Sequence, residues 1–266
     1  MTTIVLIHGT CLTARCWDGW ARHLRDRGFD VLAPAWPGLS SDVEALRADP
    51  APLAGLGIAT ILDHHESIVR GLGEPPVIIG HSTGATIAQL LLGRGLGAAG
   101  IALAPAPTKG LHTLPLAAMT AAWPGLRDPR NVHGVVELDA EQFWYRYANT
   151  LSEEESARAY ERHYVPASGR VLFESAFANF GEDSVTEVDL GRAPLLVVSG
   201  GRDHLSPPSL GLASVRRRRA SGALTGYREL AGRGHLMITE PGWEEVADHA
   251  VEWVRAALDA ESAQAA

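Results

Sequence analysis

VIIGHSTGA, residues 77 to 85, joins two segments of different character around one serine. Residues 77 to 79 are a run of β-branched apolar side chains, which is typical of a buried strand. Residues 85 to 91 carry small and apolar side chains in a pattern that predicts a helix. The stretch therefore predicts a strand, a sharp turn and a helix, with Ser82 at the turn.

Gly80 and Gly84 stand two residues on either side of Ser82. Glycine at both positions permits a turn that a Cβ atom would obstruct. Such a turn exposes the serine hydroxyl at the start of the next helix, where backbone N–H groups and the helix dipole stabilise negative charge. The residue pattern thus predicts that Ser82 is a nucleophile.

Other strand-like runs recur along the chain and alternate with amphipathic segments. Continuous Val, Ile and Leu runs are typical of strands that are buried on both faces of a parallel sheet. We therefore expect an α/β protein with a doubly wound, mostly parallel sheet of about six strands. The runs are TIVLIHG from Thr3, FDVLAPAW from Phe29, PPVIIGHS from Pro75, GIALAPA from Gly100, APLLVVSGG from Ala193 and GYRELAG from Gly226.

The alternation stops between about Pro105 and Asp189, where no strand-like run is found. Two or three helices are expected in residues 139–164 and 169–180, with a cluster of aromatic residues at positions 143 to 147. Because the sheet pattern resumes afterwards, an insertion is favoured over a separate domain. The expected division is a core of residues 1–104 and 186–266, with a helical lid of residues 105–185.

A serine nucleophile needs a base, and the base needs a carboxylate that orients it. His235 lies in a glycine-flanked loop between the last predicted strand and the last helix, and Asp203 follows the strand before it. Both positions are at the carboxyl ends of strands, where open α/β sheets bind ligands. We take Asp203 as the acid; His204 beside it, Asp183 and Asp189 are the alternatives.

The ordered motifs resemble those of the α/β-hydrolase fold superfamily, over essentially the whole chain. VLIHGTCLTARCW, residues 5 to 17, resembles the family's His-Gly segment after its first parallel strand. The resemblance implies that Thr10 and Thr83 donate their backbone N–H groups to an oxyanion hole. It also implies that His8 shapes the oxyanion loop and that His81 only fills a variable position of the turn.

The chain starts almost at the first parallel strand, and in this it resembles the smaller members of the superfamily. These are esterases, hydroxynitrile lyases and cofactor-free haloperoxidases. Relatives that open epoxides or displace halide carry an aspartate in place of the serine, so those reactions are not expected. Cys11 adjoins the implied oxyanion donor, and Trp144 lies in the predicted lid. Both are candidate substrate-binding residues, although a buried core position is the simpler interpretation of each.

Composition excludes several classes of partner. The chain has 266 residues, a formal net charge of −8 and 31 acidic against 23 basic side chains, so no basic face for nucleic acid is expected. The Arg216–Arg219 run is interpreted as a solvated helix face. No apolar run is long enough for a membrane span, and no signal segment is recognised at the amino terminus. A cytoplasmic location is expected.

No metal or cofactor is expected. The Asp63-His64-His65-Glu66 cluster lies in a predicted helix, where consecutive side chains point in different directions and cannot converge on one ion. A Glu66–Arg70 ion pair is predicted there instead. Cys11 and Cys16 are the chain's two cysteines, and we expect both to be reduced thiols.

The sequence thus predicts a serine hydrolase that cleaves an ester, thioester or lactone of a small to mid-sized substrate through Ser82, His235 and Asp203. Two alternatives stay open. The same triad serves lyase, perhydrolase, acyl-transfer and cyclisation reactions, and a ligand-binding, receptor-like protein can use the same scaffold. The oligomeric state is not predicted.

Overall fold

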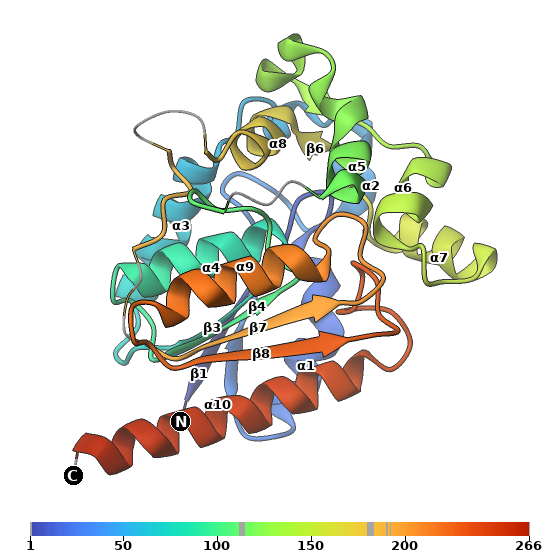
Figure 1. Ribbon diagram of the computed structural model, residues 1–266. Helices are drawn as coiled ribbons and strands as arrows, with labels where there is room; N and C mark the ends of the chain where they lie inside the picture. Colours follow the sequence, from blue (N-terminus) through green and yellow to red (C-terminus); the bar gives the residue numbers. More distant parts are fainter. Residues whose placement is uncertain (1, 112–114, 180–183, 190, 192, 266) are drawn as a thin grey trace.

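The computed structural model describes residues 2–111, 115–179, 184–189, 191 and 193–265 (Figure 1). Within them, a central six-stranded sheet has the order β2-β1-β3-β4-β7-β8, and all its pairings are parallel. This confirms the predicted class and strand number. The strands are β1 (Thr3–Ile7), β2 (Asp30–Leu32), β3 (Val77–His81), β4 (Ala99–Leu103), β7 (Leu195–Gly200) and β8 (Thr225–Leu230).

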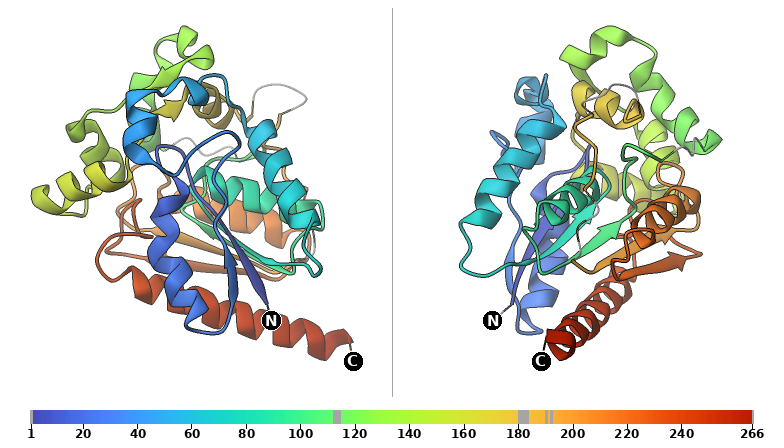
Figure 2. Two further views of the ribbon diagram at one scale, coloured as in Figure 1. Left: turned by 180° about the vertical axis from the view of Figure 1, so that it is seen from behind. Right: turned by 60° about the vertical axis from the view of Figure 1, so that its left-hand side comes forward.

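Helices cover both faces of this sheet (Figure 2). Ile4 and Leu6 of β1 pack toward α1 and α10, whereas Val5 and Ile7 pack toward α3 and α4. This alternation explains why the strands are apolar throughout: each successive residue is buried under one helical layer or the other. The helices of the core are α1 (Asp18–Arg25), α2 (Val43–Ala48), α3 (Ile58–Arg70), α4 (Thr83–Gly93), α9 (Pro208–Arg219) and α10 (Trp243–Ala265), with short 3-10 turns η1 (Ala14–Trp17) and η2 (Ala51–Leu53).

The segment between β4 and β7, residues 104–194, is here called the β4–β7 connection. Its described helices lie beyond the carboxyl ends of the strands, away from both termini (Figure 2). The elements are α5 (Leu116–Leu126), η3 (Pro129–His133), β5 (Val135–Val136), α6 (Ala140–Tyr147), α7 (Glu153–His163), β6 (Ala167–Ser168) and α8 (Gly169–Ala176). Three helices, α6, α7 and α8, form in the two stretches where two or three were expected, so that prediction is confirmed; a further helix, α5, and an antiparallel pair of strands were not predicted. The strands have two residues each, too few for a periodic signal.

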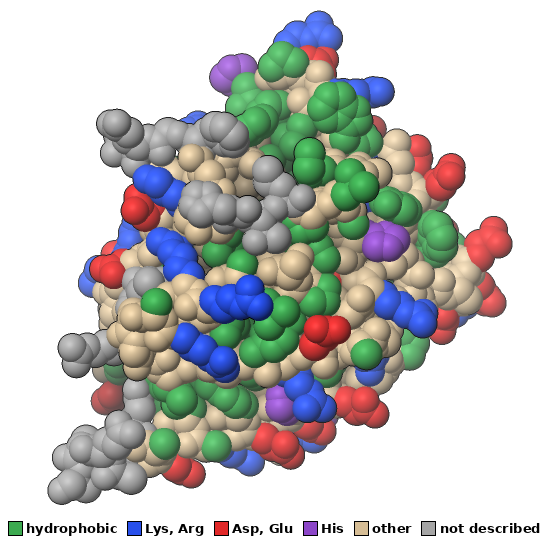
Figure 3. Space-filling view, viewed as in Figure 1, with side chains coloured by type: hydrophobic (Ala, Val, Ile, Leu, Met, Phe, Trp, Pro, Cys, Tyr) green, Lys and Arg blue, Asp and Glu red, His purple; other side chains and the backbone are tan. Residues whose placement is uncertain are grey.

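Helix α5 packs against α8 and η3 within the β4–β7 connection. It has apolar side chains along most of its length, with Pro124 inside it, so the sequence shows no amphipathic period there. Leu116, Met119 and Trp123 are exposed. Hydrophobic side chains gather on the surface in this region (Figure 3).

The arginine run at the end of α9 differs from the expected solvated face. Arg218 is only 2% exposed, and its guanidinium donates to the backbone oxygens of Gly191 and Ala193. Arg219 donates to the Thr225 oxygen. The run ends a helix that packs against β7 and β8, and there the buried Arg218 supplies donors to backbone oxygens of the segment before β7. The prediction is therefore wrong for Arg218.

Within the described ranges, no helix is both long enough and apolar enough to span a bilayer.

Candidate active site

The turn between β3 and α4 places Ser82 in a strained backbone conformation with φ of 54°. A Cβ atom on Gly80 would lie 2.1 Å from the Gly84 oxygen, and one on Gly84 would lie 2.1 Å from the Ile7 oxygen. Both distances are far below van der Waals contact, so only glycine fits. The close approach of three backbone segments is the physical reason for the Gly-x-Ser-x-Gly pattern.

Hydrogen bonds to the neighbouring strand hold this turn in place. The Ser82 N–H donates to the Leu103 oxygen at the end of β4 (2.9 Å), and the Ala106 N–H donates to the Ser82 oxygen (3.2 Å). On the other side, a Cβ atom on Gly9 would lie 2.7 Å from the Ser82 Cβ. The His-Gly segment after β1 therefore packs directly against the serine, and Gly9 is required for it. The sequence pattern alone does not distinguish Gly9, because the close approach of Ser82 is a contact between distant segments.

The loops after β7 and β8 bring Asp203 and His235 together. The His235 Nδ1 lies 2.7 Å from the Asp203 Oδ2, and the Asp203 Oδ1 accepts the backbone N–H groups of Leu205 and Ser206, both at 2.8 Å. An ionised carboxylate only accepts, so Nδ1 carries the imidazole proton and Nε2 of neutral His235 is an acceptor. That Nε2 is buried and has no hydrogen-bond partner among the described residues. It is the atom able to take a proton.

The three alternatives to Asp203 are not found beside the His235 Nδ1. His204 points its Nδ1 at the Tyr145 carbonyl oxygen, 2.8 Å away, and Asp189 is exposed on the segment before β7. Asp183 lies outside the described residues. Asp203 is thus the carboxylate that the fold brings to His235.

His81 has a larger part in the site than the resemblance implied. Its ring lies 4.8 Å from the His235 ring, centroid to centroid, and its Nε2–H donates to the His235 carbonyl oxygen at 2.8 Å. Burial holds the pKa of His81 well below its usual value, so the ring stays neutral. The residue before the serine therefore ties the loop of the base to β3.

Thr10 and Thr83 meet beside the serine, with their hydroxyl oxygens 2.7 Å apart. Both residues are buried. Thr83 is the first residue of α4, and the N–H groups of a first helical turn have no partner within the helix. The fold brings the two predicted donors together, and their role in holding an oxyanion stays a prediction.

The two candidate substrate-binding residues differ in position. Cys11 is buried with φ of 65°, and burial raises the pKa of its thiol to about 11, so it is a protonated thiol beside the oxyanion loop. Trp144 is 42% exposed and lines a cavity of about 530 Å³ with residues of α6 and α7. None of Ser82, Asp203 and His235 lines that cavity.

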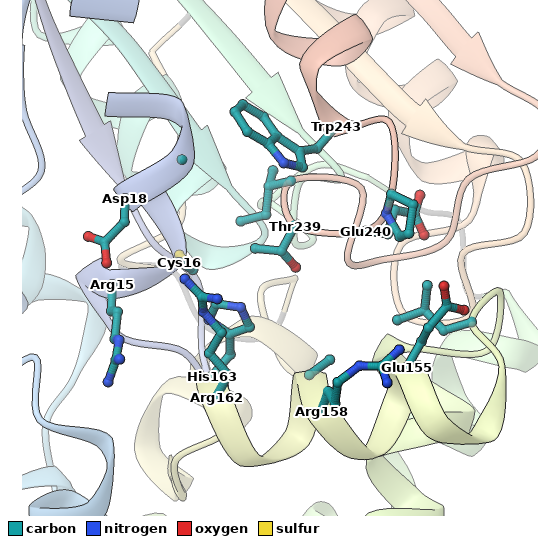
Figure 4. Close-up of a pocket in the computed structure, with 15 residues that line it drawn as sticks. Arg15, Cys16, Asp18, Glu155, Arg158, Arg162, His163, Thr239, Glu240 and Trp243 are labelled. Carbon is teal, nitrogen blue, oxygen red and sulfur yellow. The ribbon is translucent and has the colours of Figure 1, made fainter. Parts of the chain in front are cut away.

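Another cavity, of about 350 Å³, lies between α7, the start of α1 and the loop after β8 (Figure 4). Thr239 and Glu240 approach it from one side, and Arg158 and Arg162 of α7 from the other. Burial raises the pKa of Glu240, whose Oε2 accepts the Thr150 hydroxyl at 2.7 Å. Ser82, Asp203 and His235 are absent from the walls of this cavity as well.

No cluster of three or more His, Cys, Asp or Glu side chains in the described part of the chain is arranged to hold a metal ion. The predicted Glu66–Arg70 ion pair is confirmed, with a distance of 2.7 Å between nitrogen and oxygen.

Comparison with known proteins agrees with this architecture. Residues 4–249 match the alpha/beta hydrolase family, and the chain belongs to that family. No curated protein sequence matches the chain.

Solved structures share the fold at low sequence identity. An extracellular α/β-hydrolase from a Paenibacillus species, described as structurally and functionally homologous to tobacco salicylic acid binding protein 2, superposes with a TM-score of 0.70 and is 18% identical; the match covers 95% of this chain and 98% of that one. A monoacylglycerol lipase from Paleococcus ferrophilus superposes with a TM-score of 0.67 at 23% identity, and the match covers 95% of this chain and 93% of that one. A polyneuridine aldehyde esterase superposes with a TM-score of 0.63 at 17% identity, and the match covers 95% of this chain and 98% of that one.

Gly84→Ala is expected to destabilise the protein by about 3 kcal/mol or more, because its Cβ would overlap the Ile7 carbonyl oxygen. Gly73→Ala is the control, since a Cβ there meets nothing within 4 Å and the change should stay within about 0.5 kcal/mol. Urea unfolding of both variants measures the difference. Equal stabilities would contradict the packing argument.

Buried histidines should make the protein less stable in mild acid. Burial lowers the pKa of His8 to about 3 and those of His65 and His163 to about 4. Below the unfolded value of 6.5 the unfolded chain binds more protons, so the free energy of unfolding falls as the pH falls from about 6.5 towards 4. Each histidine adds up to about 1.4 kcal/mol per pH unit.

Urea titrations at several pH values between 7.5 and 4.5 measure this slope. His65→Leu removes one of these histidines outside the catalytic cluster, so its slope should be smaller than that of the wild type. A pH-independent free energy of unfolding, or identical slopes in the two proteins, would show that these rings are not held neutral.

Proposed function

We propose that the protein is a serine hydrolase that cleaves an ester, thioester or lactone of a small to mid-sized substrate. The observation that carries the proposal is the His235–Asp203 hydrogen bond of 2.7 Å, which leaves the His235 Nε2 without a partner beside the strained serine turn. Membership of the alpha/beta hydrolase family supports the assignment.

In this mechanism the Ser82 hydroxyl attacks the substrate carbonyl carbon while His235 takes the hydroxyl proton at Nε2. Asp203 holds the imidazole in the required tautomer and stabilises the imidazolium that forms. The developing oxyanion lies between the backbone N–H groups of Thr10 and Thr83, at the positive end of α4.

Collapse of the tetrahedral intermediate requires a proton on the leaving group, and His235 donates it from Nε2. An acyl-enzyme on Ser82 remains. Water then attacks the acyl carbon while His235 accepts a proton from that water, and His235 returns this proton to the Ser82 oxygen as the carboxylic acid is released.

The surroundings of the triad support a substrate that is largely enclosed. Ser82 is 8% exposed, and Asp203 and His235 less so. We propose that the β4–β7 connection, which lies beyond the carboxyl ends of the strands, acts as the lid and supplies the wall of the substrate site. Exclusion of water by such a cover strengthens the electrostatic interactions inside it.

Ser82→Ala should lower kcat/KM for ester hydrolysis by at least about 10³-fold, because nothing replaces the nucleophile. Ser221→Ala is the control: that serine donates to the Arg218 oxygen at the end of α9, and its loss should leave turnover unchanged. A panel of p-nitrophenyl esters, thioesters and lactones provides the assay. Full turnover by Ser82→Ala would refute the mechanism.

The choice of acid can be tested with a pair of variants. Asp203→Asn should reduce kcat on the order of 10³- to 10⁴-fold, since an amide favours the wrong imidazole tautomer. Asp189→Asn changes the rival carboxylate in the same way and should have no effect. Steady-state kinetics on the best ester of the panel decide the matter, and a larger loss in Asp189→Asn would reassign the acid.

A further inference from the structure

Tyr147, the last residue of α6, is buried at the point where the β4–β7 connection meets the catalytic loops. The sequence shows only one aromatic residue among several at the end of a predicted helix, and no spacing distinguishes it. In the structure its hydroxyl contacts the loop after β1, whereas its ring and its backbone carbonyl both contact the segment of His235.

The hydroxyl reaches the oxyanion loop. The Tyr147 O–H donates to the Thr10 carbonyl oxygen at 3.1 Å. Burial keeps the pKa of Tyr147 well above its usual value, so the phenol remains a donor. This bond restrains the carbonyl group of Thr10. It therefore also restrains the backbone of Thr10, whose N–H group is the proposed oxyanion donor.

The backbone and the ring reach the base. The Leu236 N–H donates to the Tyr147 carbonyl oxygen at 3.1 Å, and the Tyr147 ring meets the His235 ring edge-on, with centroids 5.1 Å apart and planes at 78°. Packing of this kind limits rotation of the imidazole. One side chain therefore touches both the loop of the base and the loop of the oxyanion donor.

Neighbouring residues extend these contacts to the acid. The Asn149 Nδ2 donates to the Arg202 carbonyl oxygen at 2.8 Å, and the His204 Nδ1 bonds the Tyr145 carbonyl oxygen at 2.8 Å. Arg202 and His204 are the residues directly before and after Asp203. The end of α6 is thus attached to all three loops that carry the proposed machinery outside the serine turn.

Tyr147 is itself held rigidly. Its ring stacks on Phe143 at 5.3 Å with an interplanar angle of 9°, and Phe143 in turn packs edge-on against Tyr160 and Tyr164. Tyr160 donates its hydroxyl to the Leu138 carbonyl oxygen at 2.9 Å, within the β4–β7 connection. The aromatic cluster gives Tyr147 a fixed base from which it can position other groups.

We propose that Tyr147 is a positioning residue that fixes the oxyanion loop relative to the catalytic base. This inference rests on the proposed hydrolase function. It also means that the end of α6 is a fixed part of the proposed active site. The hydroxyl acts on Thr10, and the ring and carbonyl act on the segment of His235.

The kinetic consequence is specific. Donors that hold an oxyanion act on charge that develops in the transition state, so a misplaced donor lowers kcat more than it changes KM. Misplacement by about 1 Å costs on the order of 10²-fold. Removal of the Tyr147 hydroxyl only loosens the loop, and about a tenfold loss of kcat with unchanged KM is expected.

Tyr147→Phe and Tyr160→Phe form a matched pair, because each removes one phenol hydroxyl that donates to a backbone carbonyl oxygen in the same aromatic cluster. Both should lose similar stability, about 1 kcal/mol. Only Tyr147→Phe should lose kcat on the best ester of the panel. Equal kcat values in the two variants, or a loss confined to KM, would overturn the proposal.

Hydrogen–deuterium exchange of the peptide that covers residues 8–13 gives a readout that does not depend on activity. Tyr147→Phe should raise exchange there relative to the wild type, and Tyr160→Phe should not. If the wild type hydrolyses nothing, the proposed function fails. The exchange result then still decides whether Tyr147 holds the oxyanion loop, since equal exchange in both variants would refute it.

Discussion

The close approach of backbone at Gly80 and Gly84 is the constraint on which the site depends. The start of α4 lies so near β1 and β3 that a methyl group at either glycine would overlap a main-chain atom. This proximity forces the positive φ of Ser82 and places Thr83 at the first turn of the helix. The packing of the buried strands and helices on both faces of the sheet holds Ser82 in this strained conformation.

The rest of the machinery follows from strand order. Because β1, β3, β7 and β8 are parallel members of one sheet, the loops after them emerge at the same edge. His235 and Asp203 come from loops after neighbouring strands and meet at 2.7 Å, while His81 ties the base loop back to the serine turn. The end of α6 then closes over these loops. The β4–β7 connection is therefore bonded directly to the loops of Asp203 and His235.

The sequence predicted the parts of the protein whose patterns are local. The six strands, the serine turn and the loops of Asp203 and His235 are all marked by apolar runs and glycines in the order that the fold requires. The contacts of Tyr147 could not be predicted, because they join α6 to segments more than a hundred residues away in one direction and more than fifty in the other. The burial of Arg218 was hidden for a similar reason: its acceptors are main-chain oxygens, which leave no trace in the sequence.

We propose that Ser82 is an activated nucleophile beside a working oxyanion hole. Intact-mass spectrometry after exposure to a fluorophosphonate probe, with sequencing of the labelled peptide, tests it most directly. An activated Ser82 should give a single phosphonyl adduct on that residue and none in Ser82→Ala. A folded wild-type protein that stays unlabelled, or that is labelled at another residue, would contradict it.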